Sequence, residues 1–335
     1  EKNKVKMAST TKIMTAIIVI ENGNLDKTIE ISKKAASTGG SRLGLKTGDK
    51  ITINNLLYGL MLCSGNDAAV ALAESIAGSV SDFAILMNNK AKELGLKNTH
   101  FETPHGLDSD NHYTTAYELA LLTDYALKNS TFSKIVGTKN YTININGYPK
   151  NLTNTNELLG NLNGIYGVKT GFTNGANRCL VTACKRGDMD IICVVLGADT
   201  KKFRTQDSIK LIEYTFNNYT YINIENKVNE YFNNWLAANN DNFIIEKGVS
   251  QNIDINYSHL SQSIIPIKKS EVNNISFLID VNTYLQSPIY ENDKIGSLSV
   301  LLNNDVICHC DILCKNSIDK KNIFSYLLEF LSFWC

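Results

Sequence analysis

Three short groups of polar residues along this 335-residue chain have the types and spacing for joint chemistry. The first contains a serine and a lysine three positions apart, Ser9 and Lys12. On a helix, residues three apart share one face, so the amine of Lys12 can reach the hydroxyl of Ser9. A serine hydroxyl is a weak nucleophile until a neighbouring base takes its proton. The pair therefore predicts a serine acyl-transferase that uses lysine as its base.

The second group, Ser64-Gly65-Asn66, interrupts a strongly apolar helical pattern over residues 54–76. Serine, glycine and asparagine favour caps and turns, so the triplet alone predicts only a helix break. Polar breaks between apolar runs cluster at functional sites, however. We expect Ser64 to relay a proton to the leaving amine and Asn66 to hold the substrate amide.

The third group, Lys-Thr-Gly, occurs twice in the chain. Residues 46–48 lie in a glycine-rich stretch and predict a turn whose lysine is solvated. Lys169, Thr170 and Gly171 lie instead in an extended run. A ligand that lies along a strand edge needs a glycine for close approach and donors for its carboxylate. We therefore assign the chemistry to the second copy.

Two further roles follow from this assignment. Lys169 is the candidate second cation that, together with burial, would lower the pKa of Lys12 enough for it to act as a base. The backbone N–H groups of Ser9 and Phe172 are the expected oxyanion hole.

The surrounding patterns predict the elements that position these groups. The expected helices cover residues 12–20, 54–76 with a break near 63–66, 81–94, 115–127 and 203–216. The expected strands cover residues 165–173, 177–184 and 189–196, the last two joined by a turn at 185–188. Helices followed by an antiparallel run and a further helix indicate an α+β domain over residues 1–218.

The chain changes character after about residue 220. Short strands at 248–255, 276–281, 294–302 and 306–313 predict a small β-rich domain over residues 219–318. Residues 319–335 are rich in apolar side chains but too short to span a bilayer. They predict an amphipathic helix at a membrane interface, and a terminal helix docked on its domain is an equally good interpretation.

Composition and cysteine spacing argue against a nucleic-acid-binding protein, a membrane-spanning protein and a disulfide-stabilised scaffold. Lys+Arg and Asp+Glu are equal at 33 each, so no global field favours nucleic acid. No stretch reaches the roughly 20 apolar residues of a membrane-spanning helix. Eight cysteines are too sparse for a disulfide scaffold, and Cys308, Cys310 and Cys314 lie in a strand-like pattern that predicts buried free thiols.

No metal or cofactor is expected. His100, His105 and His112 lack the His-Glu-x-x-His pairing of zinc peptidases, and the Pro-His-Gly turn gives His105 a structural role.

Beyond the three motifs, the chain resembles the serine D-alanyl-D-alanine carboxypeptidases, the low-molecular-weight penicillin-binding proteins, over roughly residues 7–217. The matching stretches are residues 57–69, 104–108, 112–116 and 168–173. The resemblance implies a serine β-lactamase/DD-peptidase-like fold with an antiparallel sheet and helices. More weakly, residues 288–313 and the C-terminal helix resemble the family's β-rich stalk and membrane anchor.

The resemblance also implies roles for individual residues. Ser9 would be the acyl nucleophile and Lys12 its base, with Ser64 and Asn66 as the second catalytic element. The substrate-binding residues would be Lys169, Thr170, Gly171, Phe172 and Arg204, the last near the substrate's terminal carboxylate.

The implied function is removal of the terminal D-Ala from peptidoglycan stem pentapeptides, at the outer face of the bacterial cytoplasmic membrane or in the cell wall. β-Lactam antibiotics would be a second class of ligand, and the C-terminal helix would contact the membrane peripherally. One alternative is a serine β-lactamase, for which Glu157 is the only acidic residue between Asp124 and Lys169. Another is a cell-wall-binding module without turnover.

The N-terminal edge of the first domain is expected to be incomplete. Members of the family normally carry a strand or two before the nucleophile helix, and fewer than ten residues precede Ser9 here. Apolar surface would then be exposed at that edge.

Overall fold

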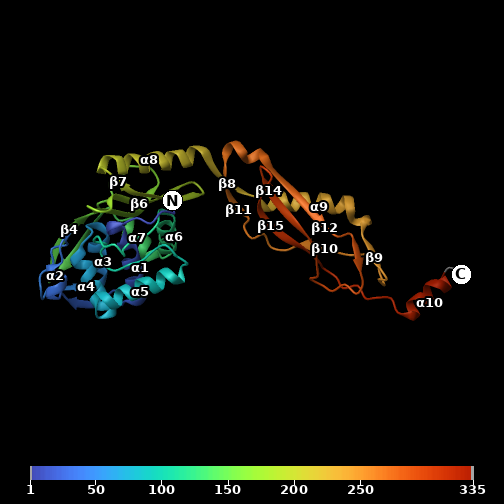
Figure 1. The fold of residues 1–335 in the computed structure, drawn as a ribbon, viewed down its shortest axis with the longest axis horizontal. Coiled ribbons are helices and arrows are strands. Elements are labelled where there is room, and N and C mark those ends of the chain that lie inside the picture. The colour runs from blue at the N-terminus through green and yellow to red at the C-terminus, as the bar shows by residue number, and fades with distance from the viewer. Residues whose placement is uncertain (1, 333–335) are drawn as a thin grey trace. The chain divides into compact units, whose positions relative to one another are not determined.

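The computed structural model describes residues 2–332 and divides into two compact units, Glu1–Asn217 and Asn218–Cys335. Figure 1 labels the elements of both units. Each unit has its own apolar core.

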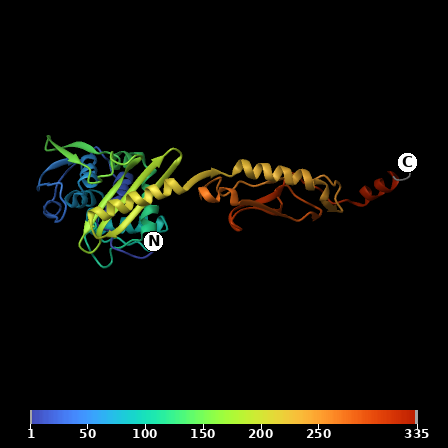
Figure 2. The ribbon, with the colours of Figure 1, turned by 90° about the horizontal axis from the view of Figure 1, so that it is seen from above.

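The first unit places a sheet between helices. Three antiparallel strands lie in the order β5 (Ile165–Thr173), β6 (Asn177–Arg186), β7 (Met189–Ala198). One helix, α8 (Lys201–Asn218), covers one face of this sheet, and the other helices gather on the opposite face (Figure 2). This arrangement agrees with the apolar residues, because Ile212 of α8 packs on the sheet residues Cys184 and Cys193. The α+β expectation is confirmed.

The helices on the second face build the main core. They are α1 (Lys12–Asn22), α2 (Lys33–Ser37), α3 (Ile53–Leu62), α4 (Asn66–Ala77), α5 (Val80–Glu93), α6 (Ala116–Leu127) and α7 (Ser130–Val136). Residues 12–19 of α1 are buried, as the nearly all-apolar run predicts. The interrupted helix is also confirmed, since α3 ends at Leu62 and α4 begins at Asn66.

Two small two-stranded sheets of this unit were not predicted. They pair β1 (Thr28–Glu30) with β2 (Lys50–Thr52), and β3 (Asn140–Ile145) with β4 (Tyr148–Thr153). Their strands are short or largely exposed, so the alternation of apolar residues is weak. The turn between β6 and β7 is tighter than expected, because both strands continue to its Gly187-Asp188 centre.

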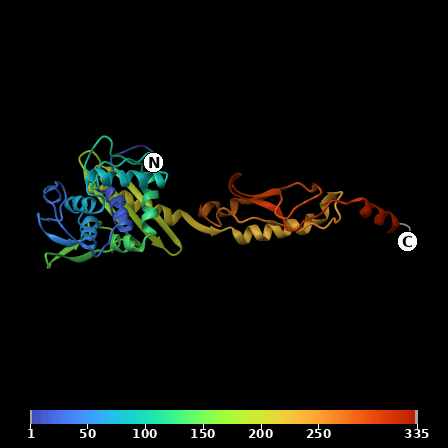
Figure 3. The ribbon, with the colours of Figure 1, turned by 90° about the horizontal axis from the view of Figure 1, so that it is seen from below.

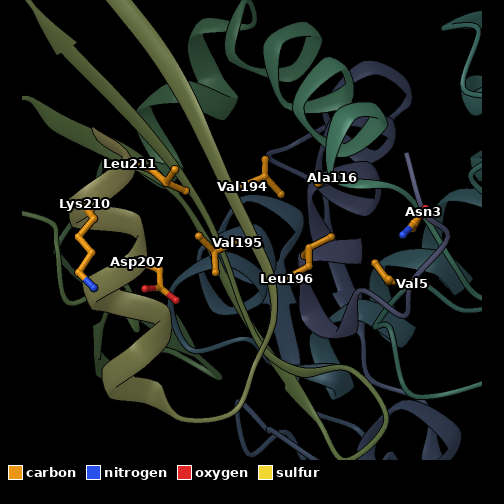
Figure 4. A pocket seen from close by; sticks show the side chains of 9 residues that line it. All are labelled: Asn3, Val5, Ala116, Val194, Val195, Leu196, Asp207, Lys210 and Leu211. Atoms are coloured by element: carbon orange, nitrogen blue, oxygen red, sulfur yellow. The ribbon is translucent and has the colours of Figure 1, made fainter. Parts of the chain in front are cut away.

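A cavity of about 550 Å³ follows β7, an edge strand of the sheet (Figure 4). Its lining is mainly apolar and includes Val194 and Leu196 of β7, Leu211 of α8, and Val5 near the N-terminus. None of the nine predicted site residues lines it.

The second unit is built around an antiparallel sheet in the order β10 (Ile255–Tyr257), β15 (Asp305–Cys314), β14 (Lys294–Leu302), β12 (Ile275–Val281). Two pairs flank it: β8 (Tyr219–Asn223) with β11 (Ile264–Lys268), and β9 (Ile244–Glu246) with β13 (Tyr284–Gln286). The helix α9 (Glu225–Asn239) runs alongside the sheet and contributes Val228 and Phe232 to the core (Figure 3).

Three of the four strands predicted in this unit are confirmed, and the strand expected at 248–255 is wrong. The side-chain amide of Gln251 donates to the carbonyl of Ile245 and accepts from its N–H, at 2.8 and 2.9 Å. A side chain thus occupies backbone groups that a strand would use, and the segment stays a loop. The thiols of Cys308, Cys310 and Cys314 are buried and free, as expected.

The last described element is α10 (Ile323–Ser332). Its apolar side chains are exposed, with Ile323 at 83% and Phe324 at 72%, so α10 does not pack into the core of its unit. The docked-helix interpretation is therefore wrong for the described residues. Phe333, Trp334 and Cys335, which belonged to the same prediction, lie outside them.

Within residues 2–332, no single helix is long and apolar enough to cross a membrane. Only α4 and α5 taken together reach the required length and composition, and they are bent by 83° at their junction.

Candidate active site

Ser9 lies in a turn of 3-10 helix, Ala8–Thr11, that leads directly into α1. The hydroxyls of Thr10 and Thr11 donate to the carbonyls of Met7 and Ala8, at 2.6 and 2.8 Å, and close this turn. Ala8 has a positive φ of 49°, a conformation that costs free energy for any residue with a Cβ. Such strain is typical of functional sites.

Lys12 is fully buried, and its amine contacts three acceptors. Nζ donates to the Ser9 hydroxyl at 2.8 Å, to Oδ1 of Asn66 at 2.7 Å and to the carbonyl of His105 at 2.8 Å. Burial, and next the charge of Lys169, lower the pKa of Lys12 well below its usual value. Loss of one proton would leave a lone pair directed at the Ser9 hydroxyl, which is what a general base requires.

The break between α3 and α4 brings the second motif to the same place. Ser64 has a φ of 62°, so it turns the chain between the two helices. Asn66 then begins α4, with its Nδ2 donating to the carbonyl of Gly39 at 2.8 Å and its backbone N–H to that of Ser41 at 2.7 Å. These two bonds fix the amide so that Oδ1 faces Lys12.

The segment that holds Asn66 is itself held by a buried carboxylate. Asp67 accepts the backbone N–H groups of Leu43, Gly44 and Leu45 at 2.7–3.0 Å. Sequence reasoning missed this residue, because a side chain that binds backbone about 20 residues away leaves no periodic signal.

The third motif lies on β5, at the edge of the sheet next to the Ala8–Thr11 turn. Lys169 is buried, and burial lowers its pKa to about 7. The hydroxyls of Thr170 and Thr155 share a hydrogen bond of 2.7 Å. A Cβ added to Gly171 would lie 3.2 Å from Ala8 and from the backbone N of Ser9, so a glycine permits this close approach.

Arg204 of α8 is 4% exposed and contacts Glu157 through one terminal nitrogen, at 3.2 Å. Burial lowers the pKa of Arg204, although the carboxylate opposes this shift. Glu157 also pairs with Lys201 at 2.6 Å, and hydrogen bonds from Lys201 and Thr205 lower the pKa of its carboxyl despite partial burial.

A cavity of about 370 Å³ joins these groups. Of the nine predicted site residues, six line it: Ser9, Ser64, Thr170, Gly171, Phe172 and Arg204. The other three, Lys12, Asn66 and Lys169, lie buried behind its wall. Five lining residues were not predicted: Ser41, Cys63, Thr155, Arg178 and Lys201.

His112, and His105, which was expected to be structural, contact residues of the Ser9-to-Lys12 segment. The backbone N–H of Glu102 donates to Nδ1 of His112 at 3.0 Å, so Nε2 carries the proton and donates to Thr11 at 2.8 Å. Burial lowers the pKa of His112 to about 4 and that of His105 to about 3, so both rings are neutral near pH 7. No group of three or more metal-ligating side chains occurs within residues 2–332.

Comparisons with known proteins agree with this geometry. A family model described as D-alanyl-D-alanine carboxypeptidase matches residues 1–200. A second, described as the C-terminal domain of penicillin-binding protein 5, matches residues 247–320.

Individual relatives extend the match along the chain. D-alanyl-D-alanine carboxypeptidase DacF of Bacillus subtilis is 34% identical over 98% of this chain and 83% of its own length. The crystal structure of DacD from Francisella tularensis has a TM-score of 0.74 and 27% identity, covering 96% of this chain and 89% of that one. The DD-transpeptidase of Streptomyces K15 has a TM-score of 0.61 and 39% identity, covering 64% and 89%.

Proposed function

The chain belongs to the D-alanyl-D-alanine carboxypeptidases, and from this premise we propose that Ser9 is the nucleophile with which it removes the terminal D-Ala of peptidoglycan stem pentapeptides. The family model and the relatives confirm the resemblance that the motifs indicated. Members of this family act on peptidoglycan peptides and bind β-lactams. The proposal concerns the residues that do the chemistry. The observation that carries it is the 2.8 Å contact between the Ser9 hydroxyl and a buried lysine amine.

The reaction begins when neutral Lys12 takes the Ser9 proton as Oγ attacks the carbonyl carbon of the penultimate D-Ala. The backbone N–H groups of Ser9 and Phe172 would stabilise the oxyanion. Support comes from the close approach of Gly171, the neighbour of Phe172, to the backbone N of Ser9.

Collapse of this intermediate breaks the peptide bond. Ser64 would relay the proton that Lys12 took from Ser9 to the departing amine of D-Ala, a role supported by its position in the cavity wall. Water then attacks the acyl-enzyme on Ser9, releases the shortened peptide and restores the hydroxyl. Lys169, Thr170 and Arg204 hold the terminal carboxylate during the first step.

A β-lactamase would need a base that rapidly activates water for deacylation. Glu157 was the acidic candidate, but it is paired with Lys201 and Arg204 and does not line the cavity. Because Glu157 is held in these ion pairs, the carboxypeptidase is favoured over the β-lactamase.

The proposed location is the outer face of the bacterial cytoplasmic membrane or the cell wall, where the substrate is. Peripheral membrane contact through α10 is part of the same proposal. It is supported by the exposed apolar side chains Phe324, Leu328 and Phe330.

Intact-protein mass spectrometry after incubation with benzylpenicillin tests the nucleophile. We expect the added mass of one penicillin on the wild type and on Ser37→Ala, which changes an exposed serine that does not line the cavity, and no added mass on Ser9→Ala. D-Ala release from a peptide ending in D-Ala-D-Ala should fall by about 10⁴-fold or more in Ser9→Ala. A protein that neither acylates nor releases D-Ala would match the non-catalytic alternative.

A further inference from the structure

Three cationic side chains line the catalytic cavity, and the neighbouring carboxylates do not neutralise all of them. Arg178, Lys201 and Arg204 all line it. Glu157 pairs with the last two, at 2.6 and 3.2 Å. No carboxylate of the described residues lies within 4.0 Å of the Arg178 guanidinium.

Arg178 is held in place by an aromatic ring rather than by an acid. It lies on β6 directly opposite Phe172 of β5, and its guanidinium carbon is 3.6 Å from the centre of the Phe172 ring. Stacking of this kind keeps the planar group flat and leaves its N–H edge free to bind an anion. Since Phe172 is 47% exposed and lines the cavity, the stacked pair stands at the rim of the site.

Arg204 provides an independent sign that an anion belongs here. It is 4% exposed, yet its Nε has no hydrogen-bond partner among the described residues. A buried guanidinium nitrogen without a partner costs free energy unless a ligand satisfies it. Arg178 lines the same cavity as Arg204, so one anion bound there can meet both cations.

The position of the cavity along β5 indicates which anion these cations would bind. Gly171 packs against the Ala8–Thr11 turn, and Thr170 and Phe172 on either side of it line the cavity. A peptide whose scissile bond lies at Ser9 therefore has its terminal residue near these side chains, and that residue carries a carboxylate.

We infer that Arg178, stacked on Phe172, is a specificity-determining residue that binds the C-terminal carboxylate of the substrate together with Arg204. This inference rests on the proposed function. It makes the enzyme selective for a free C-terminal acid over the same peptide ending in an amide, and Phe172 is the platform that orients the cation.

The test compares two substrates in the variant Arg178→Gln. The substrates are a peptide ending in D-Ala-D-Ala and the same peptide with a C-terminal carboxamide. We expect kcat/KM for the acid to fall about tenfold, mainly through KM, and that for the amide to change by less than about threefold, because only the acid loses a charge-assisted bond. If the amide is turned over too slowly to measure, acylation rates with benzylpenicillin and its methyl ester give the same comparison.

Two further variants make the outcome specific. Arg178→Lys keeps the charge but cannot stack as a planar fork, so its selectivity should be intermediate. Arg186→Gln is the matched control: Arg186 also lies on β6 and stacks on a phenylalanine, Phe216, at 4.6 Å, but it pairs with Glu213 and does not line the cavity. Its selectivity should equal that of the wild type.

Equal losses on both substrates in Arg178→Gln, or no loss on either, would overturn the inference while leaving the nucleophile assignment intact. Failure of the wild type to acylate at Ser9 would instead overturn the proposed function.

Discussion

The amine Nζ of Lys12 lies 2.7 Å from Oδ1 of Asn66, which joins the start of α1 to a residue 54 positions further along the chain. The amide cannot turn around, because its Nδ2 donates to the carbonyl of Gly39 at 2.8 Å. Asn66 thus offers Lys12 an acceptor without a negative charge. A neutral acceptor binds the amine yet does not raise its pKa as a carboxylate would.

Replacing Asn66 by aspartate tests this reasoning. The carboxylate of Asn66→Asp would stabilise the protonated form of Lys12 and raise its pKa. Since the base must be neutral, acylation by benzylpenicillin at pH 7 should fall at least tenfold, and the rate should recover as the pH rises towards 10. The measurement is the acylation rate constant between pH 6 and 10.

Asn66→Ala is the control for this variant. It removes the acceptor without adding charge, so acylation should slow with no shift of the pH profile to higher pH. A profile that moves equally in both variants would contradict the role of charge.

Replacing Asp67, which lies next to Asn66, is predicted to lower the stability of the protein. Asp67→Asn replaces one acceptor oxygen by an NH₂ group facing buried N–H donors of residues 43–45. We expect the free energy of unfolding to fall by about 3 kcal/mol and the amides of residues 43–45 to exchange faster with solvent. Urea denaturation and hydrogen exchange measure the two effects.

The matched control is Asp49→Asn, since Asp49 also accepts a backbone N–H, that of Lys46, but in an exposed turn. Its cost should stay below about 1 kcal/mol. Equal costs for the two variants would show that burial of the Asp67 carboxylate does not matter.

The sequence was informative where packing follows a local pattern. The apolar run of α1, the polar break between α3 and α4, and the extended runs of β5 to β7 are each visible in a short stretch of sequence, and the structure has the predicted element at each place. The helix α9 was missed because its few apolar residues, such as Val228 and Phe232, stand among asparagines.

Contacts between distant segments could not be found in this way. Arg178 stacks on Phe172 only because the register of β5 and β6 places them opposite each other. The support of Asn66 by Asp67 likewise depends on the path of residues 39–45, which follow no helical or strand pattern. The motif residues were identifiable from the sequence, whereas the groups that orient them required the fold.

Lys169 makes stability depend on pH in a defined direction. Its pKa is about 7 in the folded protein, against about 10.4 in an unfolded chain. Between these values the unfolded state binds more protons, so stability rises with pH across this window, by up to about 1.4 kcal/mol per pH unit. Urea denaturation at pH 7, 8 and 9 should show a smaller rise in Lys169→Met than in the wild type.

Lys185→Met serves as the control for this effect, because Lys185 is exposed on the neighbouring strand β6. It should keep the wild-type slope. A Lys169→Met variant whose slope equals that of Lys185→Met would mean that Lys169 is ordinarily protonated when buried.

Gly106 is predicted to be indispensable for the shape of the Ala8–Thr11 turn, which carries Ser9. It has a φ of +84°, and a Cβ added there would lie 2.0 Å from the carbonyl oxygen of Ala8, the residue before Ser9. Gly48, the glycine of the unused Lys-Thr-Gly copy, has a φ of +85° but no atom within 4 Å of an added Cβ. The positive φ should therefore lower the free energy of unfolding of both alanine variants by about 1–2 kcal/mol, and only Gly106→Ala also displaces Ala8.

Acylation by benzylpenicillin separates the two effects. Gly48→Ala should be slightly less stable and acylate at the wild-type rate, whereas Gly106→Ala should acylate at least tenfold more slowly even at temperatures where it remains folded. Equal acylation rates would mean that the turn tolerates movement of Ala8. In that case the positive φ of Ala8 would not be required to aim the Ser9 hydroxyl at Lys12.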